Sequence, residues 1–103
     1  AVLDMGYSLL EDCGFTRAEA VRATGRLVMR NIENVLEAGC DGALTGPIER
    51  NDIETVKKHI ACMQNDDSDD VRLYKILGTK LVNIAEKKNS DKDYTQMMEL
   101  LKG

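Results

Sequence analysis

Apolar side chains recur along most of this chain at intervals of three and four residues, which is the spacing of one face of an α-helix. No segment alternates between apolar and polar residues in the way that a half-buried strand does. The pattern therefore predicts an all-α fold, a bundle of about five helices.

The first two helices are predicted from their end signals. The first runs from the start of the chain to about Cys13 and stops at Gly14, a residue suited to the left-handed position after a helix. The second opens with Thr16 and Glu19 in the spacing of a capping box and continues to Gly39. Its apolar stripe, which we expect to be buried, comprises Val21, Gly25, Val28, Ile32 and Val35, with Met29 and Leu36 beside it.

Three further helices are expected after residue 50. Asn51, with Glu54 three positions on, is expected to cap the third, and an acidic segment over residues 66–70 leads into the fourth. The fifth is expected to start at Ser90 and Asp91. Their apolar positions are, in turn, Ile53, Val56, Ile60 and Met63; Val71, Tyr74, Gly78, Leu81 and Ala85, with Leu77 and Ile84 beside them; and Tyr94, Met97, Met98 and Leu101.

Glycine occupies the middle of three predicted stripes, at Gly6, Gly25 and Gly78. A glycine inside a helix costs about 1 kcal/mol relative to alanine, so each should have a structural reason. We expect a neighbouring helix to approach closely at these positions; space for a ligand is the alternative.

Length and charge narrow the classes of protein. The 103 residues suffice for one domain and leave no room for a separate cofactor domain. A net charge of −4 argues against nucleic acid or an anionic membrane as the main partner. No apolar run reaches the roughly 18 residues of a membrane span, and the first residues lack the features of a signal peptide. Because helical spacing starts at Val2, we expect a piece of a longer protein.

Metal binding is not predicted. The three cysteines, Cys13, Cys40 and Cys62, form no CxxC pair, so we expect reduced thiols in a cytoplasmic protein. The acidic segment at 66–70 fits no EF-hand register, because neither possible start places Gly at position six and Glu at position twelve. Its carboxylates are better explained by the dipole of the helix that follows.

Few other side chains indicate chemistry. His59, the single histidine, is expected to be a surface or hydrogen-bonded residue that could border the preceding loop. The pairs Lys57-Lys58 and Lys87-Lys88 are expected on solvated faces. No P-loop, glycine-rich dinucleotide turn or ordered catalytic triad is present. The apolar end of the chain at Met97, Met98, Leu100 and Leu101 would suit an adaptable interface.

The loop before the third helix carries the one candidate site. Thr45, Gly46 and Pro47 form a turn that leads to Arg50 and Asp52 at a helix start. A helix N-terminus favours an anion, and the planar guanidinium of Arg50 suits a carboxylate or phosphate. We expect Asp52 to hold Arg50 in place. From these residues alone, the favoured interpretation is a rigid connector in which Arg50 pairs with a neighbouring acid, and the anion site is the alternative.

The same loop carries a family resemblance. The run from Ala43 to Ile48 (ALTGPI), followed by Arg50, Asp52, the run 54–56 (ETV) and His59, resembles the C-terminal helical domain, catalogued as of unknown function, of a bacterial family of Rossmann-like oxidoreductases. The resemblance covers about residues 1–87. Ile60 follows the histidine where the family has leucine, and Asn51 stands where the family often has glycine. A second departure is that the interdomain segment, which in the family holds further polar motif residues including a His and an Asn, is expected upstream of Ala1.

The resemblance implies a relative of the 6-phosphogluconate dehydrogenase C-terminal type and of pyrroline-carboxylate reductase. It implies a Rossmann-like domain that binds NAD(P) outside this chain, a homodimer built through helical surfaces, and hydride transfer to or from a small polar substrate. Carried over by position, the motif residues are Thr45, Gly46, Pro47, Arg50, Asp52 and His59, and we take them as the candidate substrate-binding residues. Their catalytic roles stay open, and the domain alone should be inert. A structural oligomerisation module and an anion-sensing module are the alternatives.

Overall fold

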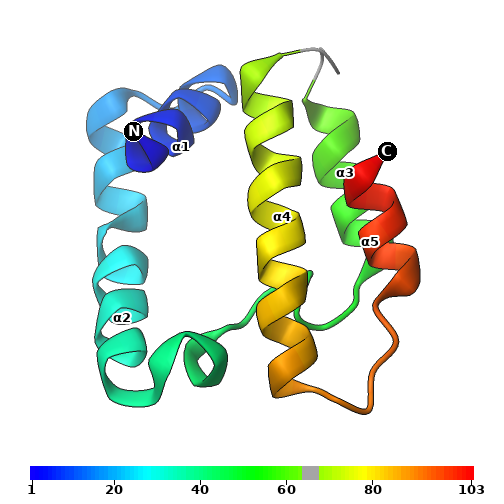
Figure 1. The fold of residues 1–103 in the computed structure, drawn as a ribbon. Coiled ribbons are helices and arrows are strands. Elements are labelled where there is room, and N and C mark those ends of the chain that lie inside the picture. Colours follow the sequence, from blue (N-terminus) through cyan, green and yellow to red (C-terminus); the bar gives the residue numbers. More distant parts are fainter. Residues whose placement is uncertain (64–67) are drawn as a thin grey trace. The chain divides into compact units, whose positions relative to one another are not determined.

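The computed structural model describes residues 1–63 and 68–103, and all regular secondary structure among them is helical. There are five helices in this part of the chain: α1 (Val2–Asp12), α2 (Arg17–Ala43), α3 (Ile53–Cys62), α4 (Asp69–Lys88) and α5 (Thr95–Lys102) (Figure 1). The all-α prediction is therefore confirmed. None of the described helices is both long and apolar enough to cross a membrane.

The predicted turn between the first two helices is confirmed. Gly14 adopts a φ of 103°, and α1 ends two residues before it. The Thr16 hydroxyl accepts from the Glu19 amide at 3.1 Å, while the Glu19 carboxylate accepts from the Thr16 amide at 3.0 Å. These two reciprocal bonds complete the capping box and satisfy amide groups that a helix start would otherwise leave unpaired.

Three predicted helix bounds need correction. Gly39 breaks the helical geometry (φ 77°, ψ 174°), but α2 resumes for one turn to Ala43, so the loop starts later than predicted. Asp52, not Asn51, caps α3. Helix α5 begins at Thr95 because the Asp93 carboxylate accepts from the Thr95 amide (2.9 Å) and hydroxyl (2.6 Å), which places the start after Ser90 and Asp91.

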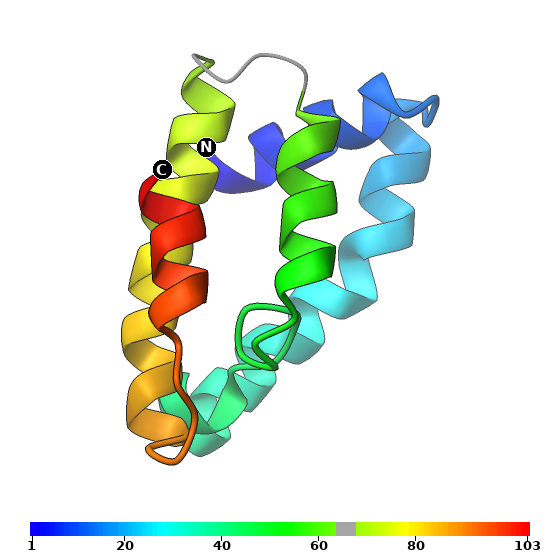
Figure 2. The same ribbon diagram turned by 90° about the vertical axis from the view of Figure 1, so that its right-hand side faces the viewer.

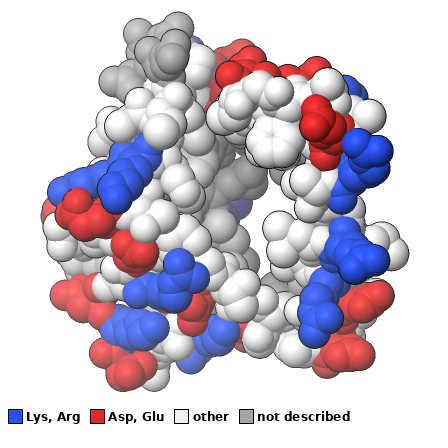
Figure 3. All heavy atoms as spheres, turned by 180° about the vertical axis from the view of Figure 1, so that it is seen from behind, with Lys and Arg blue, Asp and Glu red and all other residues white. Residues whose placement is uncertain are grey.

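The start of α4 follows the predicted electrostatics. The Ser68 hydroxyl accepts from the Val71 amide at 3.2 Å, and Asp69 and Asp70 occupy the first turn. Their charges favour the positive end of the helix dipole. Asp66 and Asp67, the other acids of this segment, lie outside the described residues. Over the face shown in Figure 3, charged side chains of both signs are interspersed.

The chain divides into two compact units, Ala1–Glu37 and Ala38–Gly103, which we call unit 1 and unit 2. In unit 1, Arg17 ties α1 to the start of α2: its guanidinium lies 2.9 Å from Asp4 and 2.7 Å from Glu11. Ala20 is fully buried. The prediction that the α2 stripe is buried is wrong for Val21, Met29, Ile32 and Leu36, which are 41–81% exposed.

Unit 2 has a core of its own. In both ribbon views α3 and α5 run in one direction and α4 runs in the opposite direction (Figures 1 and 2). Helix α5 packs on α4 and also contacts α3. The buried core cluster is Ile48, Val56, Val82, Ala85, Tyr94, Met97 and Leu101. Met97 and Leu101 are at most 1% exposed, so the expected interface at the end of the chain is largely core.

One of the three helical glycines lies at a close approach. A Cβ on Gly78 would lie 2.8 Å from Cδ2 of Leu101, so α5 can pack this closely on α4 only because Gly78 has no side chain. Gly6 and Gly25 have nothing within 4 Å of such a Cβ. The expectation of close packing is confirmed for Gly78 and wrong, within this chain, for the other two.

We predict that Gly78→Ala lowers the free energy of unfolding by about 1 kcal/mol, because overpacking against the buried Leu101 outweighs the gain in helix propensity. The matched control Gly6→Ala should raise it or leave it unchanged. Urea denaturation of both variants measures the difference. Equal effects at the two positions would contradict the close approach.

Candidate functional site

The segment from Thr45 to Asp52, which we call the Thr45–Asp52 loop, folds into tight consecutive turns. The Arg50 amide donates to the Gly46 carbonyl at 3.0 Å, and the Asp52 amide donates to the Pro47 carbonyl at 2.8 Å. Gly46 (φ 110°) and Asn51 (φ 60°) adopt positive φ. Glycine does so freely, and asparagine tolerates it better than most residues, so both suit their positions.

A hydrogen-bonded cluster joins this loop to the connection between α4 and α5. The Tyr94 hydroxyl donates to the Glu49 carbonyl at 2.6 Å. The Asn89 side-chain amide donates both to the Glu49 carboxylate and to the Tyr94 hydroxyl, each at 3.0 Å. Because Tyr94 is only 3% exposed, its position is set by the core of unit 2. The middle of the loop is thereby held by a residue of the core.

Two more contacts hold the ends of the loop. The Lys88 ammonium donates to the Leu44 carbonyl at 2.7 Å and lies 3.6 Å from the Glu49 carboxylate. Asn51 donates through its side chain to the Asp93 carbonyl at 2.8 Å. Lys88 lies on an exposed face, as expected, and its ammonium group also holds the chain next to the loop, while Asn51 positions the loop instead of capping α3.

Glu49 is the electrostatic centre of these contacts. The hydrogen bond from Asn89 lowers the pKa of its carboxyl most, and the positive charges of Lys88 and Lys92 lower it further. Its side chain is 13% exposed. The carboxylate form of Glu49 is therefore stabilised in the folded protein, where its negative charge lies beside the positive charge of Lys88.

The loop leaves its candidate ligand-binding side chains exposed. Thr45 and Arg50 are exposed, and within residues 1–63 and 68–103 the Arg50 side chain makes no hydrogen bond or ion pair. The expected Arg50–Asp52 pair does not form. Asp52 instead accepts from the Thr55 amide (3.1 Å) and hydroxyl (2.7 Å), which lowers the pKa of its carboxyl. The Asp52 carboxylate, which we expected to pair with Arg50, therefore caps α3 instead.

His59 lies apart from the loop. It follows Asp52 by seven positions on the same side of α3, which is about 10 Å along the helix. Its Nδ1 lies 3.1 Å from the Tyr74 hydroxyl of α4, and the two rings make an edge-on contact. Burial raises the pKa of Tyr74. The expectation of an exposed, hydrogen-bonded histidine is confirmed. The loop leads into α3, whereas the hydrogen-bond partner of His59 belongs to α4.

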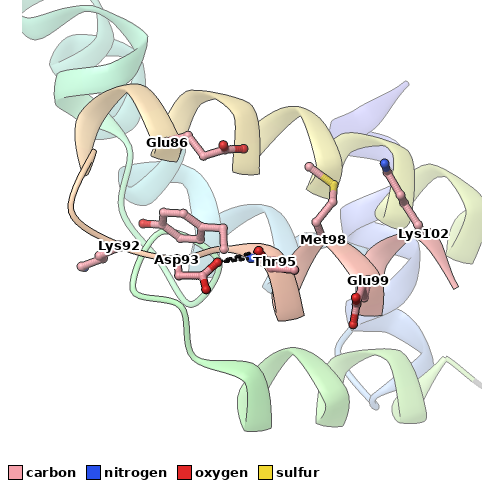
Figure 4. Close-up of a pocket in the computed structure, with 8 residues that line it drawn as sticks. Glu86, Lys92, Asp93, Thr95, Met98, Glu99 and Lys102 are labelled. Atoms are coloured by element: carbon pink, nitrogen blue, oxygen red, sulfur yellow. Dashed lines mark hydrogen bonds between the residues drawn. The ribbon is translucent and has the colours of Figure 1, made fainter.

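A hollow in unit 2 lies where the end of α4 meets α5 (Figure 4). It measures about 360 Å³ and contains none of the predicted site residues. Its Asp93 carboxylate accepts hydrogen bonds from the amide and the hydroxyl of Thr95. The lining residues are Glu86, Lys92, Asp93, Tyr94, Thr95, Met98, Glu99 and Lys102. Charges of both signs line it, so it favours no single class of ligand.

We next searched the described part of the chain for metal-binding clusters and paired cysteines. There, no three His, Cys, Asp or Glu side chains come together as a metal site would require. Cys13, Cys40 and Cys62 are unpaired and exposed. The Thr45–Asp52 loop therefore stays the candidate site.

The chain matches the family described as a domain of unknown function, DUF2520, over residues 1–81. Because the match spans most of the chain, the protein belongs to this family. No curated protein and no solved structure matches it. The matched region contains the whole Thr45–Asp52 loop and His59, while Lys88, Asn89 and Tyr94 lie beyond it.

Sequence reasoning missed the residues that hold the loop. Glu49 lies inside the motif, but its partners Asn89 and Tyr94 follow it by 40 and 45 positions, so no local spacing identifies it. Tyr94 was expected only as an apolar core residue. No local pattern carries such a contact, because the partners meet only when α5 packs on α4.

We predict that the free energy of unfolding falls as the pH drops below 4.5, which is the ordinary pKa of a glutamate carboxyl. The variant Glu49→Gln should reduce this fall. A carboxyl whose pKa is lowered by folding stabilises the protein above its unfolded pKa, and the contribution is lost as the pH passes down through its folded pKa. The glutamine oxygen can still accept from Asn89, so the structure should persist.

Urea denaturation at a series of pH values measures the effect. The control is Glu54→Gln, because the Glu54 side chain is 79% exposed and lies 3.8 Å from Lys57. Parallel pH profiles for the wild type and Glu49→Gln would show that the loop does not depend on this carboxylate.

Proposed function

We propose that this domain binds a small anionic substrate at the Thr45–Asp52 loop and forms the helical side of the substrate cleft in an NAD(P)-dependent oxidoreductase. One observation carries the proposal: the loop is anchored at Glu49 by Tyr94 and Asn89, and at the adjacent Leu44 carbonyl by Lys88, while the Arg50 side chain is exposed and unpaired. A ligand that meets a loop already in position loses less entropy on binding.

The side chains of the loop suit an anion. The guanidinium of Arg50 can donate two parallel hydrogen bonds to a carboxylate or a phosphate. Thr45 adds an exposed hydroxyl, and Gly46 lets a ligand approach the backbone. Pro47 stiffens the turn, and Asp52 fixes the start of α3 through Thr55. His59, further along α3, would border the cleft.

The cofactor would belong to another domain. The described residues form only helices and their connections, so they do not fit a dinucleotide in the usual strand–turn–helix arrangement. The resemblance of the Thr45–His59 region to a Rossmann-like oxidoreductase family supports a nucleotide-binding partner domain, which would supply the nicotinamide chemistry. This chain would bind and orient the substrate.

The same proposal includes a homodimer formed through helical surfaces and a cytoplasmic location. The exposed apolar side chains of α2 support the dimer, since large exposed apolar patches often mark interaction sites. Three unpaired, exposed cysteines agree with a reducing compartment.

We predict that Arg50→Ala weakens binding of small carboxylates and inorganic phosphate to the chain by about tenfold, the effect of losing a charge-assisted contact. The measurement is an NMR titration of succinate and phosphate followed at the amides of residues 45–52. Lys87→Ala is the control, since it removes an exposed positive charge elsewhere in unit 2. If neither anion shifts the loop amides, or both variants behave alike, the loop is not an anion site.

We predict that the protein carrying this chain together with a Rossmann-like domain binds NADH or NADPH, whereas the 103-residue chain alone binds neither. Isothermal titration calorimetry of the two proteins distinguishes these outcomes. If the longer protein binds no nicotinamide nucleotide, the oxidoreductase proposal fails and an oligomerisation module becomes the better explanation.

A further inference from the structure

Helix α2 departs from helical geometry at one residue. Gly39 adopts a φ of 77° and a ψ of 174°, and the helix resumes after it for one turn, to Ala43. This pair of angles lies in a region of backbone conformation that essentially only glycine occupies. Any residue with a side chain would be strained at this position, whatever space surrounds it.

A second glycine fits the same bend. A Cβ on Gly42 would lie 3.0 Å from the Cβ of Ala38, which is closer than side-chain carbons normally pack. In a continuous helix the Cβ atoms of residues four apart lie about 6 Å from each other, so the bend creates this close approach. The bent form therefore uses glycine at both Gly39 and Gly42, whereas a continuous helix needs neither and is weakened by both.

The bend lies in an exposed stretch of the chain. Residues 38–42 are all exposed, and among the described residues a Cβ on Gly39 would meet only the Asp41 carboxylate, at 3.9 Å. The chain is fixed again directly afterwards, because Ala43 is buried and Lys88 holds the carbonyl of Leu44. Rotation at Gly39 therefore meets no packed side chain, while the next residues stay attached to unit 2.

The bend also coincides with the boundary between the two compact units. Unit 1 ends at Glu37, and Gly39 is the second residue of unit 2. The buried core cluster of unit 2 begins at Ile48, well after the bend. A change of φ and ψ at Gly39 alone would therefore leave that core intact. Residues at the ends of structural elements that absorb such changes are the usual hinges between rigid parts.

We propose that Gly39 is a hinge at which α2 exchanges between the bent form and a continuous helix that runs to Ala43. Two opposing costs balance the forms. The glycines weaken the continuous helix, whereas the bent form gives up intrahelical hydrogen bonds at the break, where exposed backbone groups can bond to water instead.

The hinge would redirect the chain next to the candidate site. Thr45 follows Gly39 by six positions, so the exchange changes the direction in which unit 1 leaves the Thr45–Asp52 loop. The hinge is a property of the backbone. It therefore goes beyond the proposed function and is independent of whether the loop binds an anion or a second domain binds a nicotinamide nucleotide.

A distance between the two units measures the exchange. Exposed cysteines are available in each unit, so spin labels on Cys13 and Cys62 report the distance by double electron–electron resonance, in a Cys40→Ser background. Gly39→Ala should shift the ratio of the two forms about a hundredfold toward the continuous helix, because alanine is strained in the bent form and favoured in the helical one. A new distance should therefore become dominant.

Two further variants make the test specific. Gly42→Ala should favour the same new distance by about tenfold, because its Cβ is crowded only in the bent form. Gly25→Ala is the matched control within α2, since nothing lies within 4 Å of its Cβ, and it should leave the distances unchanged.

Three results would overturn the hinge. The first is one distance shared by the wild type, Gly39→Ala and Gly42→Ala, which indicates a fixed bend. The second is loss of the folded state in both of these variants, seen by circular dichroism, which indicates that the bend is obligatory. The third is an equal shift in Gly25→Ala, which indicates a general effect of helix propensity.

Discussion

The hydrogen bond from the Tyr94 hydroxyl to the Glu49 carbonyl is the contact on which the candidate site depends. It joins two segments that are 45 residues apart, and Asn89 extends it to the Glu49 carboxylate. Tyr94 belongs to the same buried cluster as Met97 and Leu101, so the packing of α5 on α4 positions its hydroxyl. A backbone carbonyl that is removed from water on folding needs a hydrogen-bond donor, and here the donor is the hydroxyl of the core residue Tyr94.

This arrangement separates support from recognition. The backbone between Leu44 and Asp52 is held by side chains from the end of α4 and from the α4–α5 connection, whereas the side chain of Arg50 takes no part in holding it. The family match covers the loop and ends at residue 81, before those supporting residues. In this chain, therefore, the conformation of the matched loop depends on the segment that follows the match.

The two units use their apolar residues differently. Unit 2 buries Val56, Val82 and Met97 completely and closes α5 onto α4 at Gly78. Unit 1 fully buries Ala20 but leaves Ile32 and Leu36 half or more exposed along α2. A short chain buries a smaller fraction of its surface than a long one, so an apolar face of this kind is more readily stabilised by association.

Local signals of the sequence determined the helical class, the capping box at Thr16 and Glu19, the glycine turn at Gly14 and the place of the candidate loop, because each depends on residues a few positions apart. Local hydrogen bonds explain the errors at Asn51 and Ser90: Asp52 caps α3 by accepting from Thr55, and Asp93 accepts from the amide and hydroxyl of Thr95, the first residue of α5. Only the tertiary structure decided which glycine lies at a helix crossing, which apolar stripe is buried, and which residues hold the loop. Those outcomes depend on contacts between segments that lie some 20 to 45 residues apart in sequence, and the spacing of residues along one helix cannot specify what packs against it.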